Sequence, residues 1–227
     1  MSDQINQQQD TLQEVRDIRQ MMERSSRFIS LSGLSGVAAG LSALIGAWIA
    51  RYVIFKNDYN EFNEYTVRYH RGSEQLRYTG SRDFNEPRMQ LIALAAAIFV
   101  VAFLSAFYFT WRKSSRQGIT LWNHTSRRLF WNMTIPLVAG GLFILGMLRY
   151  NDWSYVAPAC LLFYGLALVN ASKYTLTDIR YLGYCEIIVG LCSMQWIGGY
   201  GLYFWALGFG VLHIIYGIVM WWRYERA

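Results

Sequence analysis

The apolar run between Arg27 and Arg51 constrains the fold of this chain more than any other feature. Residues 28–50 include no ionisable side chain. An α-helix rises ~1.5 Å per residue, so these residues reach about 34 Å. The hydrocarbon core of a bilayer is ~30 Å thick. The run therefore predicts a transmembrane helix.

Composition extends this prediction to the rest of the chain. Of the 227 residues, 54% are hydrophobic and only 16% are charged, and the apolar residues gather in long runs, which is typical of membrane proteins. We therefore expect an all-α membrane protein, a bundle of six transmembrane helices over residues 28–226. The predicted spans are about 28–50, 89–111, 129–148, 155–169, 181–197 and 202–222.

Small residues recur at helical spacing within these spans. Ser32, Gly36 and Gly40 lie four residues apart along the first span. In lipid, helices associate where small side chains let their backbones approach. The residues expected to pack helices together are Ser32, Gly36, Gly40, Gly183, Gly190, Gly210 and Gly217.

The basic residues indicate the topology. The connector 112–128 between the second and third spans has five basic residues and no acidic one, which predicts that it faces the cytoplasm. Both termini are then cytoplasmic, and the loop 55–87 lies outside. The net charge of +6 comes from cations at the ends of apolar runs, so we expect no nucleic-acid partner. Because the polar start of the chain does not resemble a cleavable signal, the first span is expected to remain as an anchor.

The N-terminal residues 1–27 predict a cytoplasmic amphipathic helix. Its apolar stripe consists of Leu12, Val15, Ile18 and Met22. Two roles fit this stripe. The helix either lies against the bundle or the lipid headgroups, or it forms a short coiled coil with a second copy or with a cytoplasmic partner.

The loop 55–87 is long and aromatic, and we expect it to be ordered. Tyr59, Phe62 and Tyr65 fit an interfacial helix, and a hairpin is expected across the turn at 71–74. The expected role of the loop is to cap the bundle; whether it binds a ligand is left open.

Two titratable residues lie deep within the predicted spans, Glu186 and His213. A charged side chain in hydrocarbon costs ~2.5–3.5 kcal/mol on insertion scales, so each should face protein or water. Tyr184, Tyr216 and Asn132 are expected near them. The set is interpreted either as a proton or cation site or as a structural hydrogen bond between helices.

The sequence predicts neither an enzyme nor a cofactor. It contains no HExxH, GxSxG or phosphate-binding glycine loop. The three histidines are too scattered to hold a haem, and no pair of ligands at helical spacing predicts a metal site. The three cysteines lie within apolar runs and are interpreted as small core residues.

The run MMERSSRFISLSGLSGVAAG, residues 21–40, resembles the start of a family of uncharacterised small multi-pass proteins of the bacterial inner membrane. The resemblance covers about 30 residues around the first span. It implies a bacterial inner-membrane location and no activity, cofactor or catalytic residue.

Two functions follow from these patterns. The first is a non-enzymatic sensor or scaffold module, coupled through the N-terminal helix to a partner or, as a homo-oligomer, to itself. The second is a small transporter linked to protons or cations through Glu186 and His213. The low number of polar residues in the spans favours the module.

Overall fold

The computed structural model describes residues 32–54, 85–116, 122–150, 152–196 and 199–226. The predicted helix over residues 1–27 and the predicted loop up to residue 84, including its hairpin, lie outside these residues. All regular structure in the described ranges is helical. The chain divides into two compact units. We call the described part of 110–198 the hairpin unit, and that of 32–109 and 199–227 the terminal unit.

Five stretches are long and apolar enough to cross a bilayer. They are Gly33–Tyr52, Met89–Arg116, His124–Arg149, Trp153–Ala171 and Gly201–Tyr224. The prediction of a helical membrane protein is thus confirmed. The predicted fifth span corresponds to α7 (Ile179–Gln195), whose 17 residues are fewer than the ~20 that usually cross a membrane.

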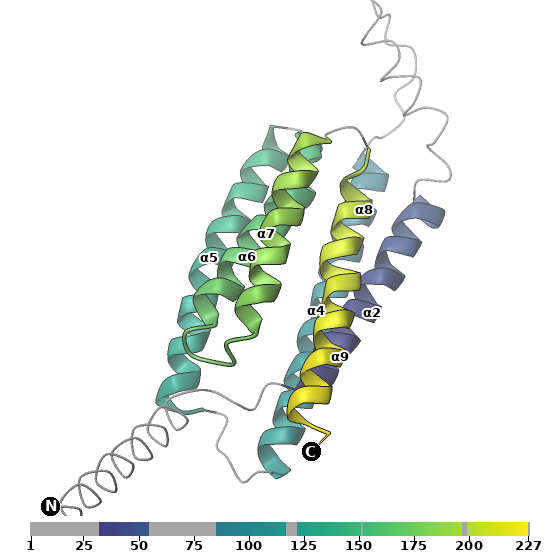
Figure 1. Cartoon of the computed structure of the whole chain (residues 1–227). Helices are drawn as coiled ribbons and strands as arrows, with labels where there is room; N and C mark the ends of the chain where they lie inside the picture. Colours follow the sequence, from purple (N-terminus) through teal and green to yellow (C-terminus); the bar gives the residue numbers. More distant parts are fainter. Residues whose placement is uncertain (1–31, 55–84, 117–121, 151, 197–198, 227) are drawn as a thin grey trace, which may run out of the picture. The chain divides into compact units, whose positions relative to one another are not determined.

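In the hairpin unit, α6 (Val156–Ala171) packs against both α5 (His124–Arg149) and α7 (Figure 1). A short 3-10 turn, η2 (Trp153–Tyr155), precedes α6. A Cβ added at Gly165 of α6 would lie 2.7 Å from the Gly183 carbonyl oxygen of α7, and one at Gly183 would lie 2.8 Å from that of Gly165. The two backbones are therefore in direct contact, as small residues permit in lipid.

Side chains complete the packing of α5 on α6. The Phe143 and Phe163 rings lie 5.6 Å apart, and Gly140 leaves the space that Phe163 fills. Asn123 and Ser126 form a capping box that starts α5, and the helix continues through Pro136. Successive helices of this unit run antiparallel.

In the terminal unit, α2 (Gly33–Ile49) packs against the last helical stretch of the chain. That stretch is continuous and consists of α8 (Gly201–Trp205), the π-helical η3 (Ala206–Leu212) and α9 (His213–Tyr224). Gly33 faces Gly217, and Gly40 faces Gly210, so α2 and the last described helical stretch run antiparallel. A π-helical turn, η1 (Ala50–Ile54), extends α2.

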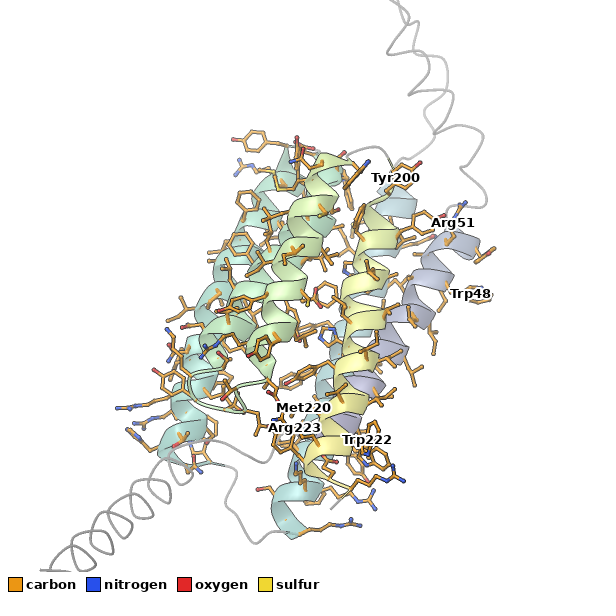
Figure 2. The ribbon with its side chains drawn as sticks, in the orientation of Figure 1. Trp48, Arg51, Tyr200, Met220, Trp222 and Arg223 are labelled. Carbon is orange, nitrogen blue, oxygen red and sulfur yellow. The ribbon has the colours of Figure 1, made fainter. Side chains whose placement is uncertain are left out.

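Figure 2 shows the two ends of this packed pair. Arg51 and Tyr200 lie at one end, whereas Trp222 and Arg223 lie at the other. Trp48 is 59% exposed and points away from the last helix.

The helix α4 (Asn85–Arg116) is the longest described element and runs from the terminal unit into the hairpin unit. Its first residues, 85–87, were predicted from the sequence to belong to the loop 55–87. No side chain from 89 to 113 is buried. Its clearest contact with α2 is that of Ile98, which lies where a Cβ of Gly46 would be.

Candidate functional site

Glu186 lies on the face of α7 that packs against α6. Its side chain is 0% exposed, and both carboxyl oxygens are inaccessible. Gly183 and Gly190 share this face, and both contact α6. Tyr164 of α6 lies close enough to Glu186 to interact with it electrostatically. Glu186 is thus enclosed by protein.

The enclosure of Glu186 decides which chemistry it can perform. A carboxylate in a low-dielectric interior is costly unless it is protonated or paired. The side chain of Glu186 therefore depends on the protein groups that enclose it.

His213 begins α9, directly after the π-helical η3, and is 6% exposed. Its Nδ1 lies 3.0 Å from the carbonyl oxygen of Gly208. A carbonyl only accepts, so Nδ1 carries the hydrogen and Nε2 is the basic nitrogen of the neutral ring. The ring also stacks on that of Phe209, with centroids 5.9 Å apart. His213 is held by its own helix.

The predicted polar set is divided between the two units. Glu186, Tyr184 and Asn132 belong to the hairpin unit, whereas His213 and Tyr216 belong to the terminal unit. Tyr184 is 45% exposed, on the outer surface of α7, and the Tyr216 hydroxyl is inaccessible.

Asn132 takes part in a polar contact with Asn170 that the sequence did not predict. The Asn170 amide of α6 donates to the Asn132 backbone oxygen of α5 at 2.8 Å and to its side-chain oxygen at 3.3 Å. Lys173 donates to Asn170 Oδ1 at 3.2 Å, and the Asn132 amide donates to the Arg128 carbonyl at 2.9 Å. This chain of bonds connects α5 with the end of α6.

The glycines predicted for packing lie at contacts between helices. Gly36 and Gly40 meet the last helix near Gly217 and Gly210, and Gly183 and Gly190 meet α6. Ser32 is buried and contacts Glu225 at the end of α9. It lies before α2 as an N-cap in an extended conformation, because the helix starts only at Gly33.

Sequence reasoning missed Glu225. Its carboxylate accepts a hydrogen bond from the Gly33 backbone N–H at 2.7 Å and another from the Ser32 hydroxyl at 3.2 Å. The first turn of α2 has no acidic residue, and a carboxylate there complements the N–H groups and the helix dipole. The end of the last helix thus caps the start of the first.

Within the described ranges, no cluster of three or more His, Cys, Asp or Glu side chains could hold a metal ion. Cys160, Cys185 and Cys192 are free thiols.

The fold and these contacts define a helical membrane protein with glycine-packed, antiparallel helices. In comparisons with protein-family models, curated proteins and solved structures, nothing matched this chain. The resemblance of residues 21–40 to bacterial inner-membrane proteins therefore stays a prediction.

Proposed function

We propose that the protein is a non-enzymatic membrane module that senses or scaffolds through its N-terminal helix, residues 1–27. The observation that carries this proposal is the cap that Glu225 provides to α2. It ties the last helix to the first at the point where the N-terminal segment joins the membrane domain. A partner or a second copy that pulls on residues 1–27 would act on α2 and α9 together.

The proposed topology has six spans with both termini in the cytoplasm of a bacterial cell. The antiparallel packing of α2 and α9 supports an even number of spans, because each crossing reverses the direction of the chain. The five long stretches alone would make α2 and α9 parallel. If α7 also crosses, its 17 residues cover about 25 Å, which a locally thinned bilayer accommodates.

The basic connector 112–128 supports the orientation. Its five cations lie between the second and third spans and favour the cytoplasmic side. Residue 32 and Glu225 would then lie at the cytoplasmic face, next to the predicted amphipathic helix.

The test is the oligomeric state and partner binding of the full-length protein after the N-terminal stripe is disrupted. Leu12→Glu with Ile18→Glu places two charges within the predicted stripe. Gln13→Glu with Gln20→Glu adds the same charge on the opposite face and is the matched control. We expect the first pair alone to abolish self-association or capture of a cytoplasmic partner, as measured by light scattering and crosslinking in membranes. The proposal is wrong if both pairs behave like the wild-type protein.

A second function, a proton- or cation-linked transporter, is favoured by one specific observation. Glu186 is completely buried within a membrane helix pair, and ionisable residues in such places commonly serve transport.

Proton uptake into proteoliposomes tests this alternative. Glu186→Gln should abolish uptake, whereas Glu225→Gln, which removes a carboxylate at a helix end, should preserve it. Uptake by the wild-type protein no faster than by empty liposomes would exclude the alternative.

A further inference from the structure

The hairpin unit gathers basic side chains from two helices at one of its ends. Arg127 and Arg128 follow the first turn of α5, and Lys173 follows the end of α6; all three are exposed. The hydrogen bonds through Asn132 and Asn170 join the Arg128 backbone to the Lys173 ammonium group. Hydrogen bonds between α5 and α6 therefore keep Arg128 and Lys173 at the same end of the unit, although they are far apart in the sequence.

The charge around this end is strongly unbalanced. Residues 122–132 and 170–180 contain four basic side chains and one acidic side chain, Asp178, a net charge of +3. The first turn of α5 has no acidic residue, and the dipole of a helix adds positive potential at its N-terminus. An anion at this position would stabilise the start of α5.

Two exposed tryptophans locate this end relative to the membrane. Trp122 is 70% exposed and Trp131 is 58% exposed, and Phe130 contacts both rings, at 6.3 Å and 5.7 Å between centroids. Tryptophans of this kind gather at the level of the lipid headgroups. The basic side chains thus lie where a lipid phosphate is available.

We propose that Arg127, Arg128 and Lys173 form a binding site for the phosphate of an anionic phospholipid. The guanidinium groups pair with phosphate oxygens in a bidentate manner, and Lys173 adds a point charge from the neighbouring helix. Asn170 positions Lys173 through the bond at 3.2 Å. The exposed aromatic rings beside the site contact the acyl chains of the same lipid.

The experiment measures the thermal stabilisation of the full-length protein in detergent as lipid is added. Phosphatidylglycerol is compared with phosphatidylcholine of the same acyl chains, and inorganic phosphate is tested separately. We expect saturable stabilisation by phosphatidylglycerol alone. Arg128→Gln and Lys173→Gln should each raise the half-saturating lipid concentration about fivefold, the effect expected for one cation near an anionic lipid.

Two control variants keep the proposal falsifiable. Arg149→Gln removes an exposed cation at the opposite end of α5 and should change the half-saturating concentration less than about twofold. Arg128→Lys keeps the charge and should bind more tightly than Arg128→Gln. Equal stabilisation by both lipids, equal effects of Arg128→Gln and Arg149→Gln, or equal protection by inorganic phosphate would each overturn the assignment.

Discussion

In the hairpin unit Gly165 packs against Gly183, 18 residues further along the chain. In the terminal unit Gly33 packs against Gly217, 184 residues away. Both contacts bring a glycine of one helix against the backbone of an antiparallel helix. Without a hydrophobic force between helices in lipid, close approach of backbones selects the partner. Contact between a glycine and a neighbouring backbone therefore holds together helices that are close in the sequence and helices that are far apart in it. Only the pair that is close in the sequence can form before the last helix is inserted.

The two units also differ in where they keep polar groups. The hairpin unit encloses Glu186 and joins Asn132 to Asn170 within its helices. In the terminal unit, the carboxylate of Glu225 lies at a helix end. The bond between Asn132 and Asn170 thus joins two helices of the hairpin unit along their length, whereas Glu225 joins α9 to the start of α2.

The largest effect should come from filling the glycine contact of the terminal unit. In Gly217→Ala the new Cβ would lie 2.6 Å from two backbone atoms, Gly33 O and Val37 N. Neither atom can move without shifting α2, so we expect a loss of about 2–3 kcal/mol and a Tm lower by roughly 5–10 °C in detergent.

Gly141→Ala is the matched control, since nothing lies within 4 Å of its added Cβ. Alanine favours the helix over glycine, so this variant should gain about 0.5–1 kcal/mol. Gly183→Ala extends the comparison to the hairpin unit and should destabilise the protein like Gly217→Ala. If the three variants changed the stability in the same direction, close backbone packing would not be what holds the helices of each unit together.

An intermediate effect is expected from the asparagine contact of the hairpin unit. Asn170→Leu removes the donor of the bonds to Asn132 and should cost about 0.6–1.7 kcal/mol, the range measured for polar contacts between membrane helices. Asn132→Ala keeps the backbone oxygen that accepts the 2.8 Å bond, so it should cost less. Unfolding of the two variants in mixed micelles, measured side by side, checks this order, and the reverse order would contradict the geometry.

The cap at the start of α2 should contribute somewhat less. Glu225→Ala removes the acceptor for Gly33 and Ser32, and the loss of an N-cap contact costs about 1 kcal/mol. Arg226→Ala alters the neighbouring exposed residue and should leave the Tm unchanged. Equal melting curves for the two variants would show that the cap does not stabilise the terminal unit.

The smallest effect belongs to the opposite end of the same pair. Arg51 Nε donates to the Tyr203 hydroxyl at 3.3 Å, and the contact is exposed. Tyr203→Phe should change the stability by less than about 0.5 kcal/mol, because water replaces such a bond. A larger loss in thermal unfolding would mean that both ends of the pair are held by polar contacts.

The sequence predicts the helical class and the packing faces well, because both depend on local spacing. Gly36 and Gly40 recur at helical spacing, and they lie at a helix contact. Periodicity predicts which face of a helix packs but not which helix it packs against, so it could not predict the contact of Gly40 with Gly210. The π-helical segment Ala206–Leu212 also leaves no mark in hydropathy.

The polar contacts were harder to predict. Glu186 was expected to face protein or water because a carboxylate avoids lipid, and it is enclosed by protein. The contact of Asn132 with Asn170 was not predicted, since depth along a helix does not tell which neighbour it faces. Glu225 gave one usable signal, a helix start without an acidic residue of its own, but the cap comes from 192 residues away.

The central claim, that the last helix closes on the first with their ends joined, is tested most directly by crosslinking. Cysteines replace Ser32 and Glu225 in a chain whose own three cysteines are changed to serine, and a short bismaleimide is applied in native membranes. We predict an intramolecular crosslink in this pair. None is expected in the control pair Arg51→Cys and Glu225→Cys, because Arg51 lies about 27 Å further along the helix axis. A crosslink in the control pair alone, or only between two copies of the chain, would contradict the antiparallel closure of the terminal unit.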